Sequence, residues 1–200
     1  MRVIGLVLAG GSGSRLGTVR KWQLRLGGKM LIQRITEQFR NDAQQVLISA
    51  RPDEEGIAPY GMCLPDLDLP IAGPLAGLVA AMDHIGRKVD DDAVIVSVAV
   101  DTPFLPANYV SRLLVAVEKG HAAAQAGWRG NGYPTNAAWR LSALFEMQDR
   151  LIDGTEISSP RALLAALDAP LVDWSNEAED DPFANINTLG DLIALAGRRA

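Results

Sequence analysis

Cysteine and histidine are nearly absent from this chain, which has one cysteine, Cys63, and two histidines, His84 and His121. A single cysteine excludes an internal disulfide and any metal site built from several cysteines. With only two histidines beside it, the chain lacks the usual ligand set of a zinc centre. Its chemistry therefore has to come from carboxylates, cations and backbone groups.

The chain also has neither a strong excess of positive charge nor a long apolar run. Its 19 lysines and arginines against 24 aspartates and glutamates give a net charge of −5. This net charge gives no reason to expect a protein that binds nucleic acid or an anionic membrane. Local positive charge could still bind a phosphate ligand. No stretch approaches the roughly 18–20 apolar residues that span a bilayer. The short apolar start of the chain runs directly into glycines, so we expect a cytoplasmic protein.

The remaining composition is ordinary for a soluble domain. Of the 200 residues, 48% are hydrophobic and 22% are charged. These values exclude a disordered, collagenous or coiled-coil chain. The length allows one sizeable core, and no repeat or linker divides it, so we expect a single domain over residues 1–200.

Strand and helix patterns alternate along the first half. Three continuous apolar runs predict buried strands: Val3–Leu8, Val46–Ala50 and Ala93–Val100. Three segments with helical spacing lie between or after them: Leu31–Phe39, Pro74–Ile85 and Pro106–Val117. This alternation predicts a three-layer α/β/α sandwich with a mainly parallel central sheet.

The second half is less regular. Further strands are predicted at Ala122–Trp128 and Thr135–Arg140, and short helices at Leu141–Leu151 and Pro160–Leu167. The acidic stretch Asn176–Asp181 is predicted to be a loop. A last helix, running to about Leu195, can be capped by Asn187 or Thr188.

A glycine-rich segment follows the first predicted strand, reading Leu8-Ala9-Gly10-Gly11-Ser12-Gly13-Ser14-Arg15-Leu16-Gly17. Open α/β sheets bind nucleotides at such a position, because glycines let backbone amides approach phosphate oxygens. Arg15 and Lys21 add the charge that amides lack. No Gly-Lys-Ser/Thr follows, which excludes a P-loop, and Leu16 stands where a dinucleotide fingerprint needs a third glycine. A tight turn with surface cations is the alternative.

Asp101 follows the most apolar run in the chain, in the sequence Asp101-Thr102-Pro103. It should lie at the carboxyl end of a strand and point into the same cleft as the glycine loop. A carboxylate there either forms a turn or holds a cation. Mg²⁺ needs only one or two carboxylates when substrate phosphates supply its other ligands.

A third candidate region joins Pro65-Asp66 to Gly73-Pro74-Leu75-Ala76-Gly77. The small residues let a helix start tightly, and its free amides can meet an anion or a base edge. Asp66 could accept two hydrogen bonds from the edge of guanine, which offers N1–H and N2–H₂. A surface aspartate in a loop is the alternative reading.

Together these motifs resemble the molybdenum cofactor guanylyltransferase (MobA) family, in order over nearly the whole chain. The opening loop is shared by many nucleotidyltransferases. The combination of Gly-Pro-Leu-Ala-Gly, Asp-Thr-Pro and Phe183-Ala184-Asn185-Ile186-Asn187-Thr188 is more specific. The resemblance implies a Rossmann-like nucleotidyltransferase fold and transfer of GMP from GTP to molybdopterin, with Mg²⁺ and release of pyrophosphate.

The resemblance also implies roles for individual residues. Those expected to bind the nucleotide are Leu8, Ala9, Gly10, Gly11, Lys21, Ser49, Asp66, Gly73, Pro74, Leu75 and Asp101. Catalytic roles are expected for Arg15, Lys21 and Asp101, with Arg15 assigned from its charge next to the glycine loop, and the resemblance makes Asp101 the magnesium ligand as well. Asn185 and Asn187 would lie on the acceptor side. Transient contact with a molybdopterin-donating protein or a molybdoenzyme is a further implied partnership.

The chain departs from the family pattern in several places. Arg20-Lys21-Trp22 stands where the family usually has Asp-Lys-Gly, and Ser49 replaces an asparagine. Tyr133-Pro134-Thr135 replaces a His-Pro-Thr segment, and Glu156 with Ile157 replaces a basic pair, for which Arg161 could substitute. The nucleotide half therefore matches the family better than the acceptor half.

Three other functions compete with this reading. One is a related nucleotidyltransferase that uses CTP or GTP with another phosphorylated acceptor; Asp66 favours guanine, because the edge of cytosine offers only one donor group. Another is a nucleotide-binding module without catalysis, which would not need Arg15, Lys21 and Asp101 aimed at one phosphate. The last is a partner-binding scaffold, supported only by the acidic loop at Asn176–Asp181.

Overall fold

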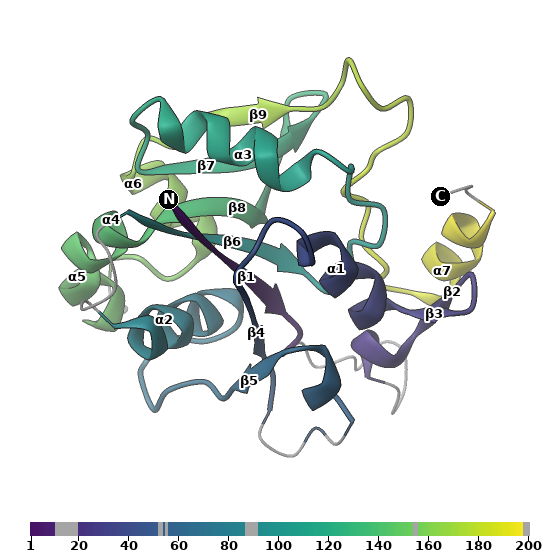
Figure 1. Cartoon of the computed structure of the whole chain (residues 1–200), viewed down its shortest axis with the longest axis horizontal. Helices are drawn as coiled ribbons and strands as arrows, with labels where there is room; N and C mark the ends of the chain where they lie inside the picture. The colour runs from purple at the N-terminus through teal and green to yellow at the C-terminus, as the bar shows by residue number, and fades with distance from the viewer. Residues whose placement is uncertain (11–19, 52–53, 55, 87–91, 154–155, 198–200) are drawn as a thin grey trace.

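A seven-stranded sheet forms the centre of the molecule in the computed structural model, which describes residues 1–10, 20–51, 54, 56–86, 92–153 and 156–197 (Figure 1). The strand order is β5-β4-β1-β6-β8-β7-β9. The strands are β1 (Arg2–Leu8), β4 (Gln45–Ser49), β5 (Met62–Leu64), β6 (Ala93–Ala99), β7 (Ala123–Trp128), β8 (Asn131–Arg140) and β9 (Leu171–Asp173). Two short strands, β2 (Arg25–Leu26) and β3 (Lys29–Met30), form a separate antiparallel ribbon.

The central sheet is mainly parallel, as the apolar runs predict. Within the described chain, β8 alone runs against its neighbours, β6 and β7, and the other pairs are parallel. The cause is visible in β6, where Ala93–Val98 is buried throughout. A strand covered on both faces needs apolar residues at consecutive positions rather than at alternate ones.

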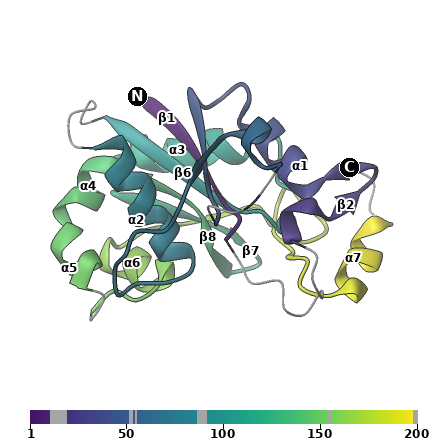
Figure 2. The same cartoon turned by 90° about the horizontal axis from the view of Figure 1, so that it is seen from below.

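Helices cover both faces of this sheet and make three layers (Figure 2). On one face lie α1 (Leu31–Phe39) and α3 (Tyr109–Glu118). On the other lie α2 (Pro74–Ile85), α4 (Leu141–Glu146), α5 (Gln148–Asp153) and α6 (Pro160–Ala166). Two 3-10 turns, η2 (Lys21–Gln23) and η3 (Ala58–Tyr60), and the C-terminal helix α7 (Leu189–Ala196) complete the described elements. The predicted α/β/α sandwich is confirmed.

Each face of the sheet has its own apolar core, and β1 contributes to both. Val3 and Val7 pack with α1 and α3, whereas Ile4 and Leu6 pack with α2. This division follows from the alternation of side chains along a strand. Gly5 faces α1, where a Cβ atom would lie 2.8 Å from the ring of Phe39, so glycine lets that ring lie against the sheet.

Some predicted boundaries are wrong. Helix α3 begins at Tyr109 rather than Pro106, because the Tyr109 amide closes a turn on the Pro106 carbonyl at 2.9 Å. The helix predicted over Leu141–Leu151 is two helices, separated at Met147. The Met147 amide donates to the carbonyls of both Ala143 and Leu144, and the bond to Leu144 is of the 3-10 type that tightens the end of α4.

The sheet also contains more strand than the sequence indicates. Strand β8 begins at Asn131 instead of Thr135, so the connection from β7 is shorter than the predicted strand boundaries imply. Strands β5 and β9 have three residues each, too few for a periodic pattern to show. In the part of the chain that the structure describes, no helix is long and apolar enough to cross a membrane.

Candidate active site

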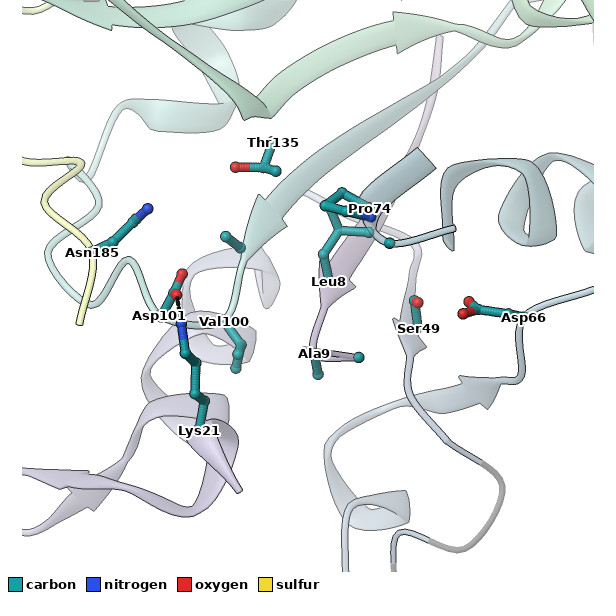
Figure 3. A pocket seen from close by; sticks show the side chains of 13 residues that line it. Leu8, Ala9, Lys21, Ser49, Asp66, Pro74, Val100, Asp101, Thr135 and Asn185 are labelled. Atoms are coloured by element: carbon teal, nitrogen blue, oxygen red, sulfur yellow. Dashed lines mark hydrogen bonds and ion pairs between the residues drawn. The ribbon is translucent and has the colours of Figure 1, made fainter. Parts of the chain in front are cut away.

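A pocket of about 210 Å³ opens at the carboxyl ends of β4, β1 and β6 (Figure 3). The chain leaves β1 toward β4 and later crosses back to β6 on the other side, so the strand order reverses here. Open α/β sheets bind ligands at such a reversal. The lining residues are Leu8, Ala9, Gly10, Lys21, Ser49, Asp66, Gly73, Pro74, Ala99, Val100, Asp101, Thr135 and Asn185.

One wall of the pocket is formed by the end of β4 and the loop that leads to α2. Ser49 is the last residue of β4 and is 4% exposed, whereas Asp66 lies in the loop after β5 and is exposed. Figure 3 shows both side chains on the side of the pocket away from Lys21. This wall therefore offers a hydroxyl and a carboxylate to a ligand.

Two glycines let α2 begin close to this wall. Gly73 precedes the helix with a φ of 66°, in the left-handed region that side chains disfavour. Gly77, one turn into α2, packs so closely that a Cβ atom would lie 2.5 Å from the Ser49 hydroxyl oxygen and 2.9 Å from Leu8. The first turn of α2 is thus held against the ends of β1 and β4.

The opposite side of the pocket carries charge. Asp101 is 8% exposed and lies in a turn closed by a 3.1 Å hydrogen bond from the Thr102 amide to the Ala99 carbonyl. The Lys21 ammonium donates to Asp101 Oδ2 at 2.6 Å and to Asn187 Oδ1 at 2.7 Å. A cation and a carboxylate thus meet at one point in the pocket.

The segment before α7 is fastened to the residues around Asp101. The Ile186 amide donates to the Asp101 carbonyl at 3.0 Å, and the Thr102 hydroxyl donates to Asn185 Oδ1 at 3.1 Å. Phe183 and Ile186 are fully buried and anchor the segment in the core beneath α3. Asn185 therefore reaches the pocket from a fixed backbone.

Tyr133 does not line the pocket and bonds away from it. Its hydroxyl donates to Asp181 Oδ2 at 2.6 Å, and its ring centroid lies 5.1 Å from that of Phe183. Burial and the Asp181 carboxylate both raise the pKa of Tyr133. Asp181 also accepts from the Phe183 amide at 2.9 Å, so the pair ties β8 to the start of the anchored segment.

The donor set fits a magnesium ion that is bound together with a phosphate ligand. Across the described ranges, no cluster of three His, Cys, Asp or Glu side chains could form a protein-only metal site. Asp101 supplies one hard carboxylate at the edge of an open pocket. Mg²⁺ is commonly held by one or two carboxylates with phosphate oxygens and water as its other ligands.

The structure brings most of the predicted site residues together. Ten line the pocket: Leu8, Ala9, Gly10, Lys21, Ser49, Asp66, Gly73, Pro74, Asp101 and Asn185. Leu75 is fully buried in the core under α2, and Asn187 bonds to Lys21 without lining the pocket. Glu156 pairs with Arg150 at 2.7 Å, and Arg161 is exposed on α6. Gly11 and Arg15 lie outside the described residues.

Three lining residues are absent from the sequence prediction. Ala99 ends β6 and Val100 follows it, directly before Asp101, so the place of both residues follows from the predicted position of Asp101. Thr135 belongs to the Tyr133-Pro134-Thr135 segment, but that pattern does not show that its side chain reaches the pocket, which depends on an irregularity in β8.

This pocket, at the carboxyl edge of a parallel sheet with a cation, a carboxylate and a glycine-started helix, defines a nucleotide-binding α/β enzyme. Residues 5–171 match the MobA-like NTP transferase domain, and the chain belongs to this family. It is accordingly a nucleotidyltransferase, which confirms the predicted enzyme class.

Named relatives agree with this assignment. A molybdenum cofactor guanylyltransferase of Rhizobium meliloti is 33% identical over 94% of this chain and 87% of its own length. One from Rhodobacter capsulatus is 36% identical over 99% and 97%. The fold resembles the crystal structure of molybdopterin-guanine dinucleotide biosynthesis protein A from Archaeoglobus fulgidus, with a TM-score of 0.72, 24% identity and 96% and 95% coverage.

Proposed function

We propose that this enzyme transfers GMP from GTP to molybdopterin and releases pyrophosphate. The names of its relatives support this substrate pair. The observation that carries the proposal is the division of the pocket, with Asp66 on one wall and the Lys21–Asp101 pair on the other. A guanine base and a triphosphate need such unlike surfaces in a single cavity.

Asp66 is the proposed guanine ligand. A carboxylate accepts hydrogen bonds only, and the edge of guanine presents N1–H and N2–H₂ as adjacent donors. Cytosine presents one donor group on its equivalent edge, and adenine presents an acceptor at N1. Two parallel hydrogen bonds to a charged acceptor favour guanine over both.

Lys21 is proposed to bind the phosphates and to stabilise the leaving pyrophosphate. The attacking phosphate of the acceptor is already ionised at neutral pH, so the reaction needs no general base from the protein. The residues that remain important are those that position the reactants and neutralise developing charge. Lys21 meets that requirement, and Arg15 is proposed to assist it.

Asp101 is proposed to hold Mg²⁺. A bound magnesium ion would neutralise charge on the phosphates and align the incoming group. Asp101 itself contributes a carboxylate whose position is fixed by the turn from Ala99 to Thr102 and by the Ile186 amide on its carbonyl. A preorganised ligand of this kind needs little rearrangement when the metal enters.

Asn185 and Asn187 are the proposed acceptor-side residues, which lie next to Asp101 and Lys21. Transient contact with a molybdopterin-donating protein or a molybdoenzyme belongs to the same proposal. The alternative is a different phosphorylated acceptor, with GTP or CTP as donor. Tyr133 favours this alternative, because it is bound to Asp181 where the family has a histidine.

The test is calorimetric titration with GTP, CTP and ATP, each with Mg²⁺. We expect selective GTP binding by the native chain and loss of that selectivity in Asp66→Ala. Asp68→Ala is the matched control, because it removes another exposed carboxylate two residues along the same loop. Preference for CTP, or indifference to the base, would overturn the role of Asp66. Molybdopterin is then offered as acceptor, with product dinucleotide as the readout.

A further inference from the structure

Strand β8 separates from β6 beside the pocket. The last pair between these strands is Ser97 with Ala137. On its other edge, β8 pairs Ala137 with Gln125 and then Tyr133 with Ala126, so residues 134–136 bulge between two consecutive residues of β7. Bulges of this kind are common next to active sites, where they redirect a side chain.

The side chain of Asn136 occupies the place where the ladder between β6 and β8 has ended. Asn136 is 1% exposed, and its Oδ1 accepts from the Ala99 amide at 3.1 Å. The amide carbonyl of this side chain thus replaces the backbone carbonyl that a paired strand would supply. The Thr135 hydroxyl, which lines the pocket, donates to the same oxygen at 3.3 Å.

Ala99 is the first residue of the turn that carries Asp101. Its carbonyl accepts from the Thr102 amide at 3.1 Å, which closes the turn around Asp101. On the side facing β1, the Val100 amide donates to the Leu8 carbonyl at 3.2 Å. The end of β6 is therefore held by β1 on one side and by the Asn136 side chain on the other.

Of the two polar atoms of the Asn136 side chain, only the oxygen has hydrogen-bond partners among the described residues. Its Nδ2 is buried and has no hydrogen-bond partner among the described residues. A buried donor without a partner is unfavourable, and an apolar side chain of the same size would avoid that cost. The hydrogen bond from the Ala99 amide to the Asn136 side-chain carbonyl explains why a polar residue stands at this buried position.

We propose that Asn136 is a positioning residue that sets the Asp101 carboxylate for metal binding by fixing Ala99. This inference rests on the proposed role of Asp101 as a metal ligand. The wall that carries Ser49 and Asp66, where the base is proposed to bind, belongs to β4, the loop after β5 and the start of α2. It receives no hydrogen bond from Asn136 in the described residues. Loss of the Asn136 carbonyl should therefore weaken the metal side of the pocket and spare the base side.

Asn136→Leu removes the carbonyl and keeps the number and branching of the side-chain heavy atoms. Asn136→Ala removes the carbonyl without the added bulk of leucine, should leucine prevent folding. Trp139→Phe is the matched control. Trp139 is also on β8 and 1% exposed, and its Nε1 donates to the Ser97 hydroxyl at 2.9 Å. This variant loses one buried hydrogen bond of the same strand pair without touching Ala99.

Three measurements separate positioning from general stability. Amide hydrogen exchange at Ala99 should become about ten-fold faster in the Asn136 variants, as expected for the loss of one hydrogen bond. Mn²⁺ affinity in the presence of GTP should fall about ten-fold, the lower end of the effect of losing a residue that supports a metal ligand. GTP affinity in EDTA should stay within about two-fold, since no base contact is lost. Trp139→Phe should lower the thermal midpoint and leave all three values unchanged.

Two results would overturn the proposal. One is unchanged Mn²⁺ affinity in both Asn136 variants. The other is an equal loss of metal-free GTP affinity and Mn²⁺ affinity, which would indicate a general structural role. Failure of the proposed function gives a different result, namely no GTP-dependent Mn²⁺ binding by the native chain. The exchange measurement at Ala99 needs no nucleotide, so it tests the Asn136–Ala99 hydrogen bond separately from the proposed function.

Discussion

The Lys21 ammonium lies 2.6 Å from Asp101 Oδ2, and the two side chains are only 18% and 11% exposed. The same ammonium lies 2.7 Å from Asn187 Oδ1, so one cation joins η2, the turn after β6 and the segment before α7. If Asp101 holds a metal and Lys21 holds phosphate, both side chains exchange partners when the substrate enters. The structure thus places the two charged groups of the proposed reaction side by side.

Asp101→Ala should abolish nucleotide transfer with little loss of folding, because the carboxylate is at the pocket edge and not in the apolar core. The measurement is the initial rate of GMP transfer at saturating Mg²⁺, with circular dichroism to check the fold. Asp83→Ala, which removes an exposed carboxylate from α2, is the control. A near-normal rate for the Asp101 variant in magnesium would rule out the metal role.

Lys21→Ala should lower the transfer rate by about 10²–10³, the usual effect of losing one preorganised group that stabilises developing charge. Lys29→Ala provides the comparison, because Lys29 is 51% exposed and pairs with Glu37 on the surface. The assay is single-turnover transfer, which separates the chemical step from nucleotide binding. A loss smaller than about ten-fold would mean that Lys21 does not stabilise the transition state.

Patterns within single segments account for what the sequence predicts well. The apolar runs of β1, β4 and β6 require burial on both faces, which fixes a covered parallel sheet and the edge where the pocket opens. The position of Asp101 is predictable because a carboxylate directly after a buried parallel strand lies at the carboxyl edge of the sheet, where the pocket opens. The position of Lys21 beside Asp101, 80 residues away, is set by tertiary packing and has no local signal.

Features that depend on the exact pairing between strands are not visible in the sequence. The bulge at residues 134–136 exists because β8 pairs with β7 in one register before it and in another after it. The three-residue strands β5 and β9 form only because a longer neighbour presents a free edge. Leu75 shows a different limit: it is part of the Gly-Pro-Leu-Ala-Gly motif, yet its side chain lies in the core under α2.

Asp191→Asn should weaken α7 at neutral pH, with an effect that disappears in acid. The Asp191 carboxylate accepts from the Asn187 amide at 2.9 Å and the Thr188 amide at 2.8 Å, and these bonds lower the pKa of Asp191. A carboxylate with a lowered pKa stabilises the fold above its unfolded pKa and loses that effect as pH falls through the folded pKa.

The measurement for this variant is the thermal midpoint between pH 7 and pH 3. Native chain and Asp191→Asn should differ at pH 7 and converge as Asp191 becomes protonated, because a protonated aspartate and an asparagine then carry the same charge. A difference that stays constant over this range would show that the charge of Asp191 does not cap α7.

Gly77→Ala should destabilise the chain and weaken GTP binding together. Alanine is favoured over glycine inside a helix by about 1 kcal/mol. At Gly77, however, the new Cβ atom would lie 2.5 Å from the Ser49 hydroxyl oxygen and 2.9 Å from Leu8, so α2 or the pocket wall must move. Overpacking of this kind costs about 1–3 kcal/mol, which outweighs the gain in helix propensity.

Gly190→Ala is the matched control for this prediction. Gly190 is also within a helix, α7, and a Cβ atom there would meet the Thr188 hydroxyl at 3.5 Å, an ordinary contact. Urea unfolding and GTP titration should therefore show a loss of both stability and affinity for Gly77→Ala, and unchanged affinity with equal or higher stability for Gly190→Ala. If Gly77→Ala binds GTP normally, Ser49 and Leu8 do not form the nucleotide wall, because their displacement is the direct consequence of the added methyl group.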